Sequence, residues 1–278
     1  MGELPLTWPA AILRWAALAF YLLVTALYAA DLFLARPVAA GRRRAILLAG
    51  VATHSWALIL SAVSLGRLPV GGSLESLSAY AWLIFVFFSV LGRKLRESTT
   101  GAFVLPVGAA IYVASLFGRR PTVLADSTFD SGWFEVHAVS SFMGYAAFSI
   151  SFCTGIMYLM LARQLGRKQM GRLFVRLPSL DVLDQVNYKA VAIGFTFLTV
   201  GMVTGVAWSH SAWGEAWSWE PVQTCALATW LIYAAYLHAR LVAGWQGARV
   251  MALAVVGFFF SLVTYLGASL LMPGKHGF

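Results

Sequence analysis

Apolar stretches long enough to cross a lipid bilayer recur along almost the whole sequence. A transmembrane helix needs about 20 mostly apolar residues. Eight runs of about 18 residues or more meet this condition. They lie at residues 10–34, 45–65, 74–92, 101–118, 137–162, 189–209, 222–242 and 250–271. The pattern predicts an all-α, polytopic membrane protein in which residues 1–278 form a single transmembrane helical domain.

The composition agrees with this prediction. Hydrophobic residues make up 60% of the chain and charged residues 11%, whereas soluble domains carry about 25% charged residues. Two Cys and 14% aromatic residues argue against a disulfide scaffold or a disordered chain. No internal repeat of fixed period is visible. The first apolar segment lacks the features of a cleaved signal peptide, so we expect it to remain in the mature chain.

The chain has 20 Lys and Arg residues against 11 Asp and Glu residues, a formal net charge of +9. Such a charge can indicate nucleic acid binding, but in membrane proteins basic residues gather in the cytoplasmic connections. Most of them here fall in alternate connections between the expected helices. This pattern predicts that both termini lie outside, and no nucleic acid partner is expected. The five on the other side are Arg14, Arg67, Arg119, Arg120 and Lys275.

The longest basic connection is residues 163–188. It mixes Arg and Lys with Leu, Phe and Val at helical spacing. This pattern predicts an interfacial segment on the cytoplasmic face, broken at Pro178 because proline cannot continue a helix. Its role as a basic topology anchor is sufficient to explain it.

The five histidines are the most informative polar residues, because ionisable groups inside a membrane are costly and often functional. His54 lies about 15 Å from the inner end of the second expected helix, at 1.5 Å per residue. His238 lies near the inner end of the seventh. His137 opens the fifth expected helix from outside and His276 follows the eighth. The sequence therefore predicts an inner pair and an outer pair of histidines.

Two neutral imidazoles that face each other from different helices can supply both axial ligands of a haem iron. The interior of a helical bundle can hold the macrocycle. Zinc is a poorer match, because the sequence offers no further ligand at the depth of His54 and His238. Any one of these histidines taken alone is more commonly a hydrogen-bonded packing residue. The pairing favours haem ligation by His54 with His238 and by His137 with His276.

The connection between the sixth and seventh expected helices is unusually rich in tryptophan. Residues 208–221 have the sequence WSHSAWGEAWSWEP, without Lys or Arg. One or two Trp residues fit an interfacial aromatic belt. The whole cluster predicts an external loop that forms a platform for a planar ligand, with indole faces covering it and N–H groups and carboxylates at its polar rim. His210 in this loop is expected to contact solvent.

Several segments together resemble the CcsA (ResC) family of cytochrome c biogenesis proteins, which carries a tryptophan-rich, haem-handling "WWD" loop. The similarity extends over nearly the whole chain. The matching segments are HSWALIL (54–60), GSLESLSAYAW (72–82), WFEVHAVSSFMGYAAF (133–148), LPSLDVLDQVNYKAVAIGF (177–195), WGEAWSWEP (213–221), ATWLIYAAYLHAR (228–240) and LGASLLMPGKHGF (266–278).

The resemblance implies a haem-transporting subunit that acts with a CcsB (ResB) partner as a holocytochrome c synthase, a haem lyase. Haem b, the transported substrate, would be ligated by two histidines and presented outside the membrane for thioether attachment to the CxxCH segment of an apocytochrome c. No catalytic residue is implied beyond those that position haem. The family's transmembrane histidines match His54 and His238, and its external histidines match His137 and His276. The loop motif matches Trp213, Gly214, Trp217, Trp219 and Glu220.

The chain departs from the family pattern at the end of this loop. The family usually has Trp-Asp-Pro-Lys-Glu, whereas residues 219–223 are Trp-Glu-Pro-Val-Gln. Glu220 keeps the acidic group, but the charged pair after the proline is lost. His210 stands where the family commonly has Asn. The partner's large external domain is not part of this chain, so a complete synthase is expected to need that partner.

Two other functions are compatible with parts of the pattern. A di-haem b-type membrane protein that transfers electrons would use the same four histidines but would not need the Trp-rich loop. A HemX-like regulatory membrane protein would share the helices without that loop. The expected location is the bacterial plasma membrane, with the thylakoid membrane as the alternative.

Overall fold

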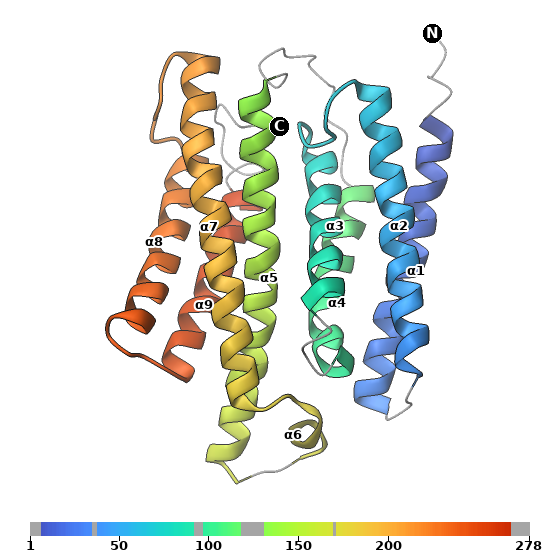
Figure 1. The fold of residues 1–278 in the computed structure, drawn as a ribbon, viewed down its shortest axis with the longest axis vertical. Coiled ribbons are helices and arrows are strands. Elements are labelled where there is room, and N and C mark those ends of the chain that lie inside the picture. The colour runs from blue at the N-terminus through green and yellow to red at the C-terminus, as the bar shows by residue number, and fades with distance from the viewer. Residues whose placement is uncertain (1–6, 35–37, 92–96, 118–130, 169–170, 268–278) are drawn as a thin grey trace. The chain divides into compact units, whose positions relative to one another are not determined.

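The structure is a computed structural model that describes residues 7–34, 38–91, 97–117, 131–168 and 171–267 (Figure 1). The described chain is helical apart from short connections, which confirms the all-α prediction. The helices are α1 (Thr7–Leu34), α2 (Ala40–Leu65), α3 (Ser73–Leu91), α4 (Glu97–Phe117), α5 (Gly132–Gly166), α6 (Arg172–Arg176), α7 (Leu180–Trp213), α8 (Pro221–Leu241) and α9 (Ala248–Leu262), which continues as the π-helical turn η3 (Val263–Gly267).

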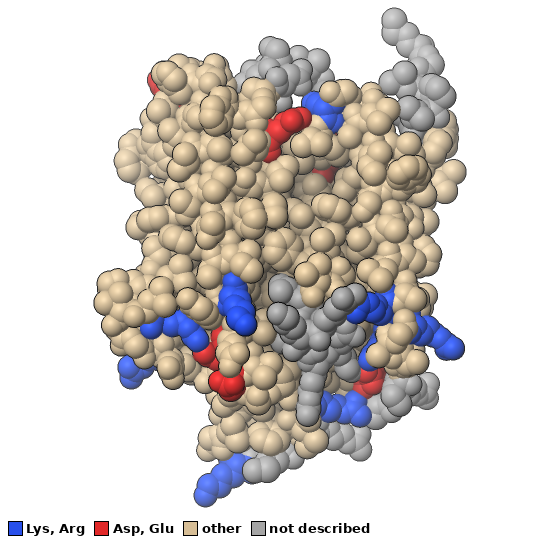
Figure 2. All heavy atoms as spheres, viewed as in Figure 1, with Lys and Arg blue, Asp and Glu red and all other residues tan. Residues whose placement is uncertain are grey.

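Each of the expected membrane spans overlaps one long helix. Six of these, α1, α2, α4, α5, α7 and α9 with its continuation, are long and apolar enough to cross a bilayer. The apolar part of α3, Leu74–Val90, is shorter. On the face shown in Figure 2, the flanks of the helices carry few charged side chains, and Lys and Arg lie near helix ends. The chain is therefore a polytopic membrane protein, and the count of eight spans and the orientation of the termini stay predictions.

The basic connection differs from the interfacial helix expected at residues 163–188. α5 runs on to Gly166, α6 has only five residues, and α7 already begins at Leu180. The Ser179 hydroxyl caps α7 by accepting the backbone N–H of Val182 at 3.5 Å. The expected break at Pro178 is confirmed. Residues 177–179 are not helical, and Ser179 caps the new helix that begins at Leu180.

The chain divides into two compact units, residues 1–124 (unit 1) and residues 125–278 (unit 2). In unit 1, α1 packs against α2 and α4, and α3 packs against α2 and α4. In unit 2, α5 packs against α7 and α9, and α8 packs against α7 and α9. Each unit is therefore an antiparallel four-helix arrangement with the same order of neighbours.

A stacked pair of aromatic rings lies at the centre of each unit. In unit 1, Tyr21 of α1 stacks on Phe85 of α3 with centroids 3.6 Å apart and planes 3° from parallel. In unit 2, Phe148 of α5 stacks on Tyr233 of α8 at 3.6 Å and 6°. All four residues are buried. Such a pair contributes about 0.5–1.5 kcal/mol beyond the apolar area that it buries.

Each of these rings lies against a glycine of a neighbouring helix. A Cβ at Gly50 would approach the Tyr21 ring to 3.0 Å, and one at Gly108 would approach the Phe85 ring to 3.0 Å. In unit 2 the corresponding distances are 2.5 Å from Gly194 to the Phe148 ring and 2.8 Å from Gly257 to the Tyr233 ring. Small residues at these places let the helices approach closely around the stacked pair.

In each unit, an equivalent hydrogen bond from a tryptophan to a hydroxyl group joins the second and third helices. Trp82 Nε1 donates to Ser55 Oγ at 2.9 Å, and Trp230 Nε1 donates to Thr199 Oγ1 at 2.9 Å. The rings, glycines and hydroxyls therefore recur in the same arrangement, although the residue types differ. The connections differ in length, so the spacing between equivalent residues is not constant. That is why no fixed period is visible in the sequence.

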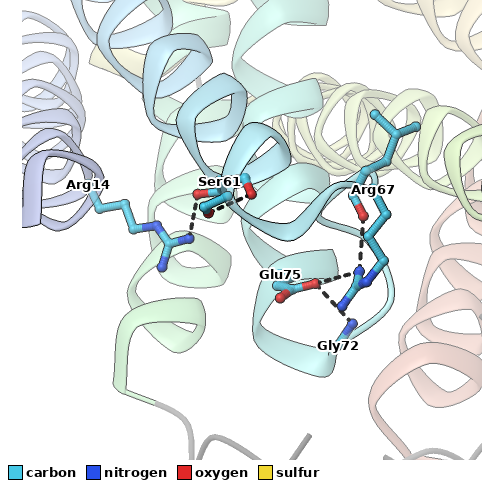
Figure 3. Close-up of polar contacts among 7 residues, drawn as sticks. Arg14, Ser61, Arg67, Gly72 and Glu75 are labelled. Atoms are coloured by element: carbon cyan, nitrogen blue, oxygen red, sulfur yellow. Dashed lines mark hydrogen bonds and ion pairs between the residues drawn. The ribbon is translucent and has the colours of Figure 1, made fainter. Parts of the chain in front are cut away.

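Polar contacts fasten one end of unit 1 (Figure 3). The Glu75 carboxylate pairs with Arg67 at 3.1 Å and accepts the backbone N–H of Gly72 at 3.3 Å, which holds the turn between α2 and α3. Near the same end of α2, Arg14 of α1 donates to Ser61 Oγ at 2.9 Å. These contacts satisfy charged and polar groups at the ends of apolar helices.

Candidate functional site

The Trp-rich segment begins inside a helix. α7 continues past both Trp208 and His210, and it ends at Gly214. Gly214 has a left-handed φ of 75°, and its N–H donates to the His210 carbonyl oxygen at 2.9 Å. Glycine adopts this conformation without steric cost and commonly ends helices. The prediction of a loop over residues 208–221 is therefore wrong for residues 208–213 and for Pro221, which are helical, and correct for residues 214–220, which join α7 to α8.

Trp208 forms the buried base of this segment, with an exposed fraction of 1%. Its indole meets the Trp213 ring edge-on at 4.8 Å between centroids. On the α5 side it contacts Phe134 at 4.9 Å. Because Phe134 lies in the first turn of α5, these three rings join the start of α5 to the end of α7.

Two hydrogen bonds hold residues 214–220 in place. Ser209 Oγ donates to the Glu215 carbonyl oxygen at 2.7 Å, and the Ser218 backbone N–H donates to Gln223 Oε1 at 2.9 Å. From the sequence, Gln223 is visible only as a departure from the family pattern. It is nevertheless the third residue of α8, a position from which Gln and Glu side chains reach back over a helix start.

Trp219 combines high exposure with an unusual backbone conformation. Its side chain is 69% exposed and its φ is 55°. A bulky residue in this region costs about 1–3 kcal/mol. Thr224 Oγ1 donates to its carbonyl oxygen at 3.1 Å, and the Trp217 ring meets its indole edge-on at 5.6 Å. An exposed indole held in this way is suited to contact a ligand.

Glu220 lies directly before α8 and is only 9% exposed. It occupies the N-cap position, with Pro221 as the first helical residue, but its side chain makes no capping hydrogen bond. A carboxylate near a helix N-terminus is still favoured by the helix dipole. Capping by hydrogen bond therefore does not explain why this residue is acidic.

His137 of α5 lies beside the buried tryptophan. Its Nδ1 is 2.7 Å from the Gly201 carbonyl oxygen of α7, and its ring is 20° from parallel to Trp208 with centroids 5.9 Å apart. A carbonyl oxygen only accepts, so Nδ1 carries the proton. The lone pair of the neutral ring is then on Nε2. This is the tautomer in which an imidazole ligates a metal through Nε2.

His54 lies inside unit 1 and is fully buried. Its Nδ1 is 3.2 Å from Tyr21 Oη, and its Nε2 is 2.9 Å from Ser78 Oγ. The Tyr112 ring lies 4.4 Å from the imidazole between centroids. Both ring nitrogens are therefore engaged by hydroxyl groups, so ligation through Nε2 requires Ser78 to give up its hydrogen bond.

The remaining histidines have different surroundings. His238 of α8 is exposed on unit 2, two residues before Arg240, which forms an ion pair with Asp184 of α7. His54 and His238 belong to different units, so their pairing stays a prediction. His276 lies outside the described residues. His210 is exposed, as expected, although it is helical.

Comparison with known proteins identifies the relationship of this chain. A family model described as cytochrome c assembly protein matches residues 70–276. The matched range includes the Trp-rich segment, His137, His238 and His276, but it begins after His54.

Three curated relatives are named cytochrome c biogenesis protein CcsA. The protein from Heterosigma akashiwo is 32% identical over 247 residues, covering 76% of each chain. The protein from Synechococcus sp. is 31% identical over 238 residues, covering 77% of this chain and 78% of its own. The protein from Chlorella vulgaris is 32% identical over 254 residues, covering 80% of each.

A solved structure of the cytochrome c haem lyase CcmF shares the fold. It has a TM-score of 0.65 at 18% sequence identity and covers 95% of this chain. This chain spans about half of that protein, 47% of its length. The family match and the curated relatives together show that this chain belongs to the CcsA family of cytochrome c biogenesis proteins and has a role in cytochrome c maturation.

Proposed function

We propose that this chain is the haem-transporting subunit of a cytochrome c synthase and presents haem outside the membrane for attachment to apocytochrome c. Haem b is the transported substrate in this scheme. The observation that carries the proposal is the position of His137. The imidazole lies beside the Trp-rich segment with its Nδ1 bonded to the Gly201 carbonyl oxygen, so Nε2 has the lone pair needed for iron.

The outer site combines axial ligands with an aromatic platform. His137 and His276 are the proposed axial ligands. The indoles can cover the macrocycle, and the Glu220 carboxylate can orient its polar edge. Gly214 ends α7 so that the platform can turn towards α8. The platform residues are Trp213, Gly214, Trp217, Trp219 and Glu220.

The attachment reaction requires positioning more than acid–base chemistry. A cysteine thiol of the apocytochrome adds across a haem vinyl group, so that sulfur bonds to one vinyl carbon and hydrogen is added to the other. Two such additions, one for each cysteine of the CxxCH segment, give the two thioethers with no net oxidation. Holding the thiols close to the vinyl groups supplies much of the rate. The apocytochrome's histidine then replaces a histidine of this chain on the iron.

His54 and His238 are the proposed inner ligands, which receive haem on the cytoplasmic side. For His54 this needs a rearrangement, because Ser78 Oγ lies 2.9 Å from Nε2. The bond between Nδ1 and Tyr21 Oη can remain and would fix the orientation of the ring. The inner pair is therefore tested separately from the outer pair.

A CcsB (ResB)-type membrane subunit is the proposed partner, and the CxxCH segment of apocytochrome c is the second substrate. The plasma membrane of a bacterium is the proposed location, with lipid around the apolar helices. The Synechococcus and Chlorella relatives are consistent with a thylakoid location as well.

The test is thioether formation on a co-expressed apocytochrome c, with the chain and its partner subunit both present. His137→Ala is expected to lower the product per molecule of synthase about tenfold or more. His210→Ala is the matched control, because His210 is an exposed histidine at the same end of unit 2. Equal product from both variants would exclude His137 from the reaction. Haem bound by the purified complex without any thioether product would instead favour electron transfer.

A further inference from the structure

The surroundings of His137 are built largely from the backbone of α7. α5 and α7 lie side by side in unit 2 (Figure 1). Gly201, Gly205 and Trp208 follow one another at helical spacing, so they form one face of α7. Gly201 provides the carbonyl acceptor for Nδ1, and Trp208 lies nearly parallel to the imidazole.

Gly205 leaves the space in which the ring lies. A Cβ on Gly205 would come within 2.6 Å of His137 Nδ1 and 2.8 Å of Cε1. Real Cβ atoms do not approach so closely, so even alanine would push the imidazole away. A shift of the ring would break the hydrogen bond between Nδ1 and the Gly201 carbonyl oxygen, which are 2.7 Å apart.

Gly201 also allows the two helices to approach each other. A Cβ there would come within 2.5 Å of Ser141 Oγ and 3.1 Å of the Ser141 backbone nitrogen on α5. Gly201 and Gly205 form a GxxxG motif, which brings helix backbones together. In this chain the close approach also puts a backbone carbonyl within hydrogen-bonding distance of a histidine.

We infer that Gly201 and Gly205 are positioning residues of the outer haem site: they set the tautomer and the direction of the His137 imidazole. This inference rests on the proposed function, because it gives His137 the role of an axial ligand. It adds that the ligand is prepared before haem arrives. The Nδ1–H donated to a carbonyl is the arrangement by which metal-binding proteins orient a ligating histidine.

The first test compares two glycine-to-alanine variants of unit 2. Gly205→Ala is expected to lower thioether product about tenfold per molecule of synthase and to reduce the low-spin, six-coordinate haem spectrum of the complex. Gly257→Ala is the matched control. Its Cβ would come within 2.8 Å of the Tyr233 ring, a similar clash with an aromatic side chain away from His137. Equal product and equal spectra from the two variants would overturn the inference.

A second test uses exogenous imidazole to separate positioning from general damage. Imidazole is expected to restore part of the product in His137→Gly, because a free ring can bind the iron from the vacated place. In the double variant His137→Gly with Gly205→Ala, imidazole should restore product to within about twofold of this level, because a free ring is not held by the α5 backbone and can shift away from the added Cβ while it binds the iron. Failure of rescue in the double variant alone would show that Gly205→Ala damages the fold and would overturn the inference.

These measurements distinguish the proposed role of His137 from the positioning role of Gly201 and Gly205. Normal product from His137→Gly without imidazole would contradict the proposed role of His137 and the positioning role with it. Loss of product from His137→Gly, together with normal product from Gly205→Ala, would leave the proposed function intact and remove only the positioning role.

Discussion

The two units share one helical plan but differ at the end where their first helix begins. In unit 1, Arg14 of α1 contacts Ser61 of α2 there. Ser61 lies as many residues after Gly50 as Gly205 lies after Gly194, so Ser61 corresponds to Gly205 of unit 2. Unit 1 thus places a hydroxyl where unit 2 leaves space for His137.

The connection between the second and third helices differs at the same end. In unit 1 it is a turn held by the ion pair of Arg67 with Glu75. In unit 2 it is residues 214–220, the non-helical part of the Trp-rich segment, which ends at the buried Glu220. The stacked rings and their glycines are common to both units, so they are explained by packing. The features that differ between the units are the better candidates for function.

His54 provides the strongest test of this comparison. It lies one helical turn beyond Gly50, and Leu198 lies one turn beyond Gly194 and is buried. A leucine therefore fits at the equivalent place in unit 2, and His54→Leu should fold. If His54 ligates haem, this variant should accumulate normally but lose nearly all inner-site haem, because leucine supplies no axial bond.

The measurement is haem absorbance per molecule of purified complex. Leu198→Ile in unit 2 is the control for repacking at the equivalent place, and it should keep its haem. Unchanged haem in His54→Leu would remove His54 from the haem pathway. His54 would then be a packing residue of unit 1, as its hydrogen bonds to Tyr21 and Ser78 would suffice to explain.

Glu220 and Glu75 test whether the second connection carries chemistry in one unit only. Glu220→Gln should lower thioether product several-fold while the protein level is kept, because the platform loses its buried negative charge. Glu75→Gln should leave product almost unchanged. The Glu75 carboxylate holds only the turn between α2 and α3, and the amide oxygen of a Gln side chain can still accept the Gly72 N–H. Equal product from the two variants would show that Glu220 has no special role.

The sequence predicts the helices well because hydropathy reports on them directly. It misses the end of α7, because the apolar pattern stops before the helix does and only Gly214 ends it. It cannot predict what positions the His137 imidazole, because this is done by a backbone carbonyl oxygen and by the absence of a side chain at Gly205. The repeated packing is hidden for a related reason. Tyr21 corresponds to Phe148, so the shared feature is a ring and not a residue type.

The smallest expected effect concerns the tryptophan hydrogen bonds that the two units share. In unit 1, Ser55 Oγ accepts from Trp82 and donates to the Val51 carbonyl oxygen at 2.8 Å. In unit 2, Thr199 Oγ1 accepts from Trp230 and donates to the Phe195 carbonyl oxygen at 2.7 Å. In both units the hydroxyl proton is donated to a carbonyl oxygen of the same helix, so the indole N–H donates to an oxygen lone pair in each.

Trp82→Phe and Trp230→Phe should therefore lower the free energy of unfolding by similar amounts, about 1 kcal/mol each for the lost hydrogen bond. Thermal unfolding of the purified protein in detergent measures this. Trp56→Phe is the control, because Trp56 neighbours Ser55 in the chain but is 58% exposed, and its loss should change stability by less than about 0.5 kcal/mol. A large loss of stability from only one of Trp82→Phe and Trp230→Phe would show that the hydrogen bond contributes unequally to the stability of the two units. The shared plan would then hold for the stacked rings and glycines but not for the contact between the second and third helices.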